Sequence, residues 1–297
     1  MISKLVARSR WFRPALVFSL AGFMILSLAG HSDAQRWQRG WRRRPIAGVD
    51  PREYQRNVTP KWENDLQFKQ DVFTFCRVEF SCDTTWGWTT DWPDSDLNFS
   101  FRLQQLTSLK VDPEGVTCRL DDPNIFNYPF IYMCEPGGLL LSPVEEKNLR
   151  RYLLNGGFLM ADDFWGSWQW DTFAEAIQGA FPDRKIVDIP LDHPVFHQVY
   201  DLKEKPQVPN VQTGEMGRGM GPGGTHISWE NREPGSREVH YRGLFDDNDR
   251  LMAIFCHNTD LGDGWEREGE YKFYFHEYSE KKAYPMGINI VVYAMTH

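Results

Sequence analysis

The feature that most constrains the fold is a strand–helix–strand succession between residues 130 and 161. Phe130–Cys134 and Phe158–Ala161 are short, continuous apolar runs, as is typical of strands buried on both faces. Between them, Ser142-Pro143-Val144-Glu145 combines an N-cap serine, a first-turn proline and a capping-box glutamate. An apolar stripe follows at Val144, Leu149, Tyr152 and Leu153, and Asn155-Gly156-Gly157 ends the helix. Strands joined by one helix over about thirty residues are parallel neighbours with a right-handed crossover.

Other segments continue this alternation of apolar runs and helical patterns. Further strands are predicted at Val72–Phe80, Lys185–Ile189 and Leu251–Cys256, with another candidate at Lys272–His276. Further helices are predicted over Ser95–Leu109, near Asp171–Ala180 and from about Pro285 to Met295. We therefore predict an α/β three-layer sandwich with a mostly parallel sheet.

A long segment from Gln207 to Arg242 lacks this alternation and contains GEMGRGMGPGG at residues 214–224. It has no GxxxxGK[ST] pattern and does not lead from a strand into a helix, so a phosphate cradle is not predicted. We predict a flexible flap over the edge of the sheet.

The N-terminal segment resembles a secretory signal. A positive leader precedes an apolar run from Ala15 to Ala29, and Ser32-Asp33-Ala34 supplies small residues for cleavage. Fifteen apolar residues are short of the about twenty needed to cross a bilayer. We predict a signal peptide over residues 1–34, cleavage after Ala34, and export to the periplasm or cell envelope, with an uncleaved anchor as the alternative.

Charge divides the rest of the chain into two parts. Residues 35–56 carry seven arginines and two acids, whereas residues 57–297 have a net charge of −16. We predict a basic, poorly ordered leader over residues 35–70 and a single domain over residues 71–297. The acidic domain argues against nucleic acid as a partner. Membrane contact is expected at most through the N-terminal segment, where Arg36–Arg44 would meet anionic lipid or polymer if it is not simply solvated.

The cysteines do not indicate a metal site. There are five, so at least one thiol is free or paired between chains. Cys76, Cys134 and Cys256 lie in apolar runs, where cysteine behaves as a small buried hydrophobe. No CxxC or Cys/His spacing suggests zinc, and no metal or cofactor is predicted.

Polar residues end or follow the predicted strands, where ligands bind in open α/β sheets. These residues are Glu79, Glu135, Asp162, Asp163, His257 and Asn258. Carboxylates that converge on one edge repel one another, which raises a pKa or invites a cation. The alternative is that some of them cap helices or face water.

Three residues are candidates for catalysis: Asp163, Glu135 and His193. Asp163 follows a strand, at the position of a nucleophile in an elbow, but ADDFWGSW holds no Ser or Cys in a GxSxG-like frame. His193 would act as a general base, or it is a turn residue before Pro194.

Two tryptophan clusters are candidates for ligand binding. One lies in TTWGWTTDWPDSD and the other follows Asp163; indoles stack on sugars or peptides, although they also serve as core residues. Acids of the first cluster precede a helix N-terminus, where capping alone explains Asp96. The predicted ligand-binding residues are Trp86, Trp88, Asp91, Asp96, Asp162, Trp165 and His257.

The chain also resembles a bacterial family, the domain of unknown function 4159. The motifs are WTTDWPDSDLNFSFRL, DDPNIFNYPFIYMCEPGG, LRRYLLNGGFLMADDFWG, DHPVFH and MGINIVVYAMTH, and they cover nearly all of residues 71–297. That family is grouped with class I glutamine amidotransferase-like folds and more distantly resembles trehalose-utilisation proteins. The resemblance implies a flavodoxin-like α/β sandwich and brings no established activity.

The chain departs from the amidotransferases at the nucleophile. Their elbow places a cysteine between glycines, whereas Ala161-Asp162-Asp163-Phe164 has none, and Cys134 follows a different strand. The leading hypothesis is therefore an exported protein that binds a small molecule, glycan or envelope protein without glutaminase activity. The alternatives are a carbohydrate hydrolase or lyase that uses Asp163, Glu135 or His193, and a structural scaffold of an envelope complex.

Overall fold

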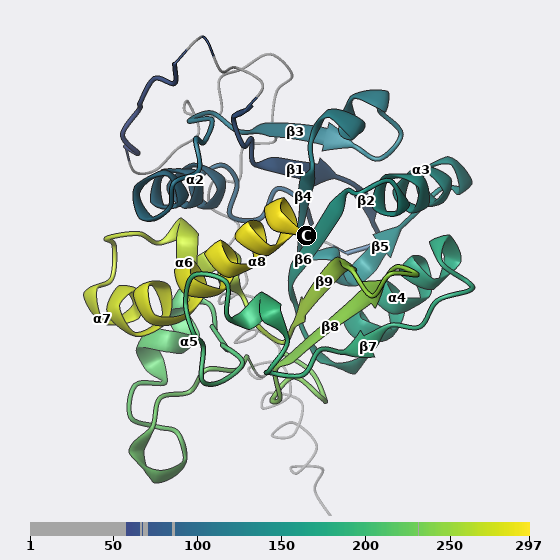
Figure 1. The fold of residues 1–297 in the computed structure, drawn as a ribbon. Coiled ribbons are helices and arrows are strands. Elements are labelled where there is room, and N and C mark those ends of the chain that lie inside the picture. The colour runs from purple at the N-terminus through teal and green to yellow at the C-terminus, as the bar shows by residue number, and fades with distance from the viewer. Residues whose placement is uncertain (1–57, 66, 68–70, 85–86, 231) are drawn as a thin grey trace, which may run out of the picture. The chain divides into compact units, whose positions relative to one another are not determined.

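The computed structural model describes residues 58–297, except residues 66, 68–70, 85–86 and 231. In this part of the chain, a seven-stranded sheet has the strand order β3-β1-β4-β6-β9-β8-β7 (Figure 1). The first five strands in that order run parallel, and β8 runs antiparallel to both of its neighbours. The prediction of a mostly parallel sheet is confirmed.

The strands of the sheet are β1 (Cys76–Glu79), β3 (Val116–Arg119), β4 (Phe130–Cys134), β6 (Phe158–Phe164), β7 (Val187–Asp188), β8 (His240–Phe245) and β9 (Leu251–His257). A separate two-stranded ribbon pairs β2 (Ser81–Cys82) with β5 (Leu139–Leu140). The helices are α2 (Asp94–Leu106), α3 (Pro143–Leu154), α4 (Gly166–Ala180), α5 (Val211–Met216), α6 (Leu261–Glu266), α7 (Lys272–Tyr274) and α8 (Tyr284–Thr296). A π-helical segment, Phe275–Ala283, joins α7 to α8.

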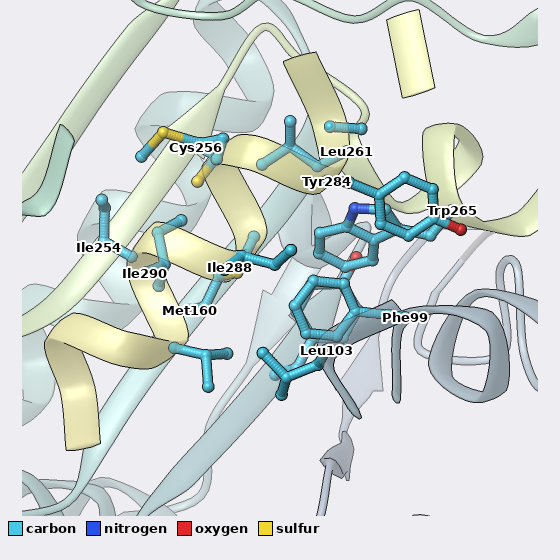
Figure 2. Close-up of a cluster of buried hydrophobic side chains, with 14 of the residues drawn as sticks. Phe99, Leu103, Met160, Ile254, Cys256, Leu261, Trp265, Tyr284, Ile288 and Ile290 are labelled. Carbon is cyan, nitrogen blue, oxygen red and sulfur yellow. The ribbon is translucent and has the colours of Figure 1, made fainter. Parts of the chain in front are cut away.

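Helices cover both faces of the sheet, which gives the three layers expected of this α/β class (Figure 1). On one face α2, α6 and α8 bury Phe99, Trp265 and Ile288 against strand residues such as Met160 and Ile254 (Figure 2). On the other face α3 and α4 pack on the alternate strand residues. The sheet therefore has a hydrophobic core on each face, because successive side chains along a strand point to opposite faces.

The α3 unit is folded as its sequence predicts. The Ser142 hydroxyl accepts a hydrogen bond from the Glu145 N–H, and the Glu145 side chain accepts one from the Ser142 N–H, so the capping box is complete. Leu149, Tyr152 and Leu153 are buried, but Val144 is exposed. The apolar stripe therefore begins one turn later than predicted.

Three sequence predictions are wrong in detail. Lys272–His276 is helical rather than a strand, because Tyr274 and Tyr278 bury their rings one turn apart. The segment 207–242 is not a continuous loop, since it contains α5 and the start of β8. The helix predicted over Ser95–Leu109 is present as α2, but Asp96 does not cap it, because the N-cap residue is Pro93 and the Asp96 carboxylate binds Arg77.

The predicted signal peptide and most of the basic leader lie outside the described residues. No helix in the described part of the chain is both long and apolar enough to cross a bilayer.

Candidate functional site

The carboxyl edge of the parallel strands gathers residues in an unfavourable backbone conformation. Asp91, Glu135, Asp163 and Asn258 all have left-handed backbones, with φ between 51° and 61°. Only one other described non-glycine residue, Asp249, shares this conformation. Such residues cost roughly 1–3 kcal/mol each and concentrate at functional sites. This edge of the sheet is therefore a candidate functional site.

Eight buried carboxylates from separate segments meet in this region, which we call the acidic site. They belong to Asp91, Glu135, Asp162, Asp163, Glu230, Asp260, Asp263 and Glu266, and each of these residues is at most 8% exposed. Asp162 and Asp163 lie near the end of β6, and the other acids come from segments that follow β1, β4 and β9 or from the stretch before β8. Sheet topology thus brings together residues that are far apart in the sequence.

Asp163 lies at the centre of this arrangement, in an irregular part of β6. The pairing of β6 with β9 shifts register between Ala161 and Phe164, so the strand continues past the turn that we predicted after Ala161. The Trp165 indole N–H donates to Asp163 Oδ1 at 2.9 Å. Trp165 is fully buried, so it orients this carboxylate and offers no surface for stacking.

Asp162 precedes Asp163 in β6 and is held by two donors. The Tyr132 hydroxyl and the Gly262 N–H both donate to Asp162 Oδ2, at 3.2 and 2.9 Å. Its other oxygen, Oδ1, is buried without a hydrogen-bond donor among the described residues. A β-carbon at residue 262 would lie 2.8 Å from Asp91 Oδ2, so glycine is required where α6 approaches these acids.

The loop that carries Asp91 is anchored by a buried guanidinium. Arg77, on β1, donates to the Asp96 carboxylate, to the carbonyls of Trp88 and Thr90, and to the Ser95 hydroxyl. The Arg77 side chain is completely buried. Asp96 therefore positions the loop and is not available to a ligand.

Burial and mutual repulsion disfavour ionisation of the acidic site. Burial raises the pKa of Asp162 to about 8. Burial and the neighbouring Glu135 raise the pKa of Asp163 well above its usual value, and burial and Asp163 do the same for Asp260. Burial and Asp91 also raise the pKa of the Cys134 thiol, which keeps it protonated. A protonated, buried thiol is a poor nucleophile.

Two arginines offset part of the negative charge. The Arg232 guanidinium pairs with Glu230 and lies 3.8 Å from Glu135. Arg267 contacts Asp263 at 3.2 Å and Glu266 at 2.9 Å. Two guanidinium charges cannot balance eight carboxylates, so the site must hold protons or take up further positive charge.

Three sets of side chains in the acidic site have ligand atoms within 4.8 Å of one another, as a metal ion requires. The sets are Asp163 with Glu230 and Asp260, Asp91 with Asp263 and Glu266, and Asp91 with Cys134 and Asp163. The first two offer only oxygen ligands, which suit Mg²⁺, Ca²⁺ or Mn²⁺ rather than zinc.

The structure brings together some of the predicted site residues. The acidic site contains Glu135 and Asp163, with Trp165 bound to Asp163, and it also contains Asp91 and Asp162. Trp88 is partly buried against the core, and Trp86 lies outside the described residues.

His193 and His257 lie elsewhere. His193 packs on Phe245, beside the start of β9 and thus at the opposite edge of the sheet, and its Nδ1 accepts the Val195 N–H. His257 ends β9, where Nε2 contacts the Gly166 carbonyl at 2.9 Å and Nδ1 contacts Arg242 at 3.0 Å. It faces a separate pocket at the start of α4.

Sequence reasoning missed Glu230, Asp260, Asp263 and Glu266. The rule that ligands bind after strand ends identified His257 and Asn258, and extending it by a few residues would have reached Asp260 and Asp263. Glu230 belongs to a long segment with no local signal. Its place depends on tertiary contacts, such as its acceptance of the Asn210 N–H at 2.8 Å.

Comparison with known proteins gives one family. The model described as "Domain of unknown function (DUF4159)" matches residues 74–295. A search of curated proteins gives no match.

Proposed function

The chain belongs to the DUF4159 family, and from this premise we propose that it is an exported protein that binds a divalent cation in its acidic site, without glutaminase activity. The family description names no activity, so the proposal depends on the site. It departs from our sequence analysis, which predicted no metal, and agrees with the expectation there that converging carboxylates invite a cation.

The excess of buried negative charge carries the proposal. Eight buried carboxylates face two guanidinium groups. At 4 Å, two like charges near a protein surface repel by about 4 kcal/mol. A divalent cation relieves this repulsion while the carboxylates stay ionised, and oxygen-only ligand sets suit a hard cation.

The strand order supports the finer fold assignment that we propose, a flavodoxin-like and amidotransferase-like sandwich. Counted among themselves, the five parallel strands have the order 2-1-3-4-5 of that class. In such sheets the ligand lies where the order reverses, which here is between β1 and β4. Asp91 and Glu135, which follow these two strands, belong to the acidic site.

The absence of glutaminase activity is proposed from Cys134. Its thiol is fully buried and points at Asp91, with Sγ 3.8 Å from Oδ2. An acid beside a thiol opposes formation of the thiolate that amide hydrolysis requires. The carbohydrate-hydrolase alternative is disfavoured because Asp163 and Glu135 are both buried, whereas a glycosidic bond must lie between its two catalytic carboxylates.

Metal titration of the full chain, freed of metal by chelation, tests the proposal. We expect Mg²⁺, Ca²⁺ or Mn²⁺ to bind by calorimetry and to raise the melting temperature. Asp260→Asn should weaken binding by about tenfold or more, because it removes one ligand oxygen charge. Without metal, the same variant should melt at a higher temperature than the wild type, because it removes repulsion.

Two further variants sharpen the test. Arg232→Gln removes a competing cation from the Glu230 side and should increase metal affinity. Asp183→Asn changes an exposed acid paired with Arg150 and should leave metal binding unchanged. Failure of all three ions to bind, or equal binding by wild type and Asp260→Asn, would show that the acidic site holds protons instead.

A further inference from the structure

A second site shares none of the carboxylates of the acidic site. It is a pocket of about 380 Å³ between the start of α4 and the strands β8 and β9. Trp170, His240, Arg242 and His257 line it, with Arg237 and other exposed residues at its mouth. This volume falls within the range of small-molecule sites.

We propose that this pocket binds the oxyanion group, carboxylate or phosphate, of a small molecule, with the Arg242 guanidinium as its principal ligand-binding group. The inference does not depend on cation binding at the acidic site, because none of the residues that carry it belongs to that site.

Arg242 is held in place by an aromatic ring, a neutral imidazole and one exposed carboxylate. Its guanidinium carbon lies 3.9 Å from the centre of the Trp170 ring, and Nη1 lies 3.0 Å from His257 Nδ1. The carboxylate paired with it belongs to Asp188, which is 61% exposed and 3.4 Å from Nε, so solvent screens this pair. The Arg242 side chain itself is only 16% exposed. The result is a largely buried positive charge with a fixed orientation.

His257 makes Arg242 rigid without adding charge. The Gly166 carbonyl can only accept a hydrogen bond, so His257 Nε2 carries the proton and donates to it. Nδ1 is then a free acceptor for the Arg242 N–H. Burial lowers the pKa of His257 to about 3, which keeps the ring neutral at physiological pH. Its ring is stacked with His240, whose pKa burial also lowers.

The remaining donors of Arg242 explain why an oxyanion fits. A guanidinium has five N–H donors in a planar fork, and the contacts above use Nη1 and Nε. Planar forks bind carboxylate and phosphate through two parallel bonds. At the mouth, Arg237 adds a second guanidinium over Trp229, whereas the acids there, Asp171 and Glu238, are exposed to solvent.

Calorimetric titration of the full chain with three probes tests the proposal. Inorganic phosphate and glucuronate represent the two sources of an oxyanion, and glucose is the uncharged counterpart of glucuronate. We expect at least one of the two anions to bind and glucose not to bind. Arg242→Gln should weaken anion binding by about tenfold or more, and Arg242→Lys should give a smaller loss because it keeps the charge but not the fork.

Arg184→Gln is the matched control. Arg184 is 14% exposed, is paired with the exposed Asp247 at 2.9 Å, and donates to the carbonyl of Phe245 at the far end of β8. Its replacement should leave anion binding unchanged. Circular dichroism of each variant shows whether it is folded. If Arg242→Gln does not fold, Arg237→Gln, at an exposed position, tests the pocket instead.

The possible results are distinct. Binding of neither anion, equal anion binding by wild type and Arg242→Gln, or equal loss in Arg184→Gln would overturn the proposal. Divalent-cation titration of the same variants should match the wild type, so failure of the cation site and failure of this pocket are separate outcomes.

Discussion

The buried ion pair between Arg77 and Asp96 gives the sharpest stability prediction. The Arg77 guanidinium is completely buried, and Asp96 is the carboxylate that binds it, through both Nε and Nη2. The variant Asp96→Asn keeps the size and shape of the side chain but removes its charge. The guanidinium would then be buried without a compensating anion.

The expected loss is large. Removing one partner of a buried ion pair costs about 3–5 kcal/mol of unfolding free energy. For a domain of this size, each kcal/mol lowers the melting temperature by about 2–4 °C, so we expect a fall of about 6–20 °C. Because Arg77 also donates to the carbonyls of Trp88 and Thr90, the loop that carries Asp91 should loosen as well.

Urea unfolding followed by circular dichroism measures this loss. The control is Asp183→Asn, which breaks a two-bond pair with Arg150 at 2.6 and 3.0 Å on the surface. Exposed pairs contribute little, so the control should be close to the wild type. If Asp96→Asn is no less stable than Asp183→Asn, the reasoning about burial is refuted. If Asp96→Asn binds cations more weakly than the wild type and Asp183→Asn does not, the ion pair between Arg77 and Asp96 supports the acidic site.

Three further predictions concern titration and thiols. The folded-state pKa of His257, about 3, lies below its usual 6.5, so the unfolded chain takes up this proton first as the pH falls. The free energy of unfolding should therefore decrease between about pH 6.5 and pH 3, by up to about 1.4 kcal/mol per pH unit. In urea unfolding at pH 7 and pH 5, His257→Gln should show a smaller difference in this free energy than the wild type. Alkylation of the native protein should modify Cys82 alone, because the other four cysteines are buried, and intact mass spectrometry would expose a second label. The Sγ atoms of Cys76 and Cys118 lie 2.7 Å apart on neighbouring strands, so these residues should form a disulfide if the proposed export delivers the protein to an oxidising compartment. Retention of both thiols in secreted material, seen as a mass higher by two hydrogens, would contradict this.

The sheet was largely predictable because its central strands are buried on both faces. Phe130–Cys134 and Leu251–Cys256 are continuous apolar runs, and the structure has strands at both places. In contrast, β8 alternates buried and half-buried residues and contains Gly243, so its sequence resembles a loop. Aromatic residues in Lys272–His276 indicated a strand, although the same rings also suit a buried helix face.

The candidate site was predictable only in part, for a similar reason. Glu135 follows β4 and Asp163 lies next to the end of β6, so topology alone places them at one edge. Glu230 and Arg232 arrive from a segment whose path depends on packing, and no periodicity reports that path. Trp165 was predicted to be a stacking surface, but its complete burial makes it a support for Asp163.

The outermost strands of the sheet are very short. β7 has two residues and β3 has four, of which Thr117 and Arg119 are exposed. An outer strand with few unpaired amide groups and a charged side chain is a poor template for a strand from another molecule. Concentrated solutions of the protein should therefore resist edge-to-edge aggregation, even though the sheet interior is almost entirely apolar.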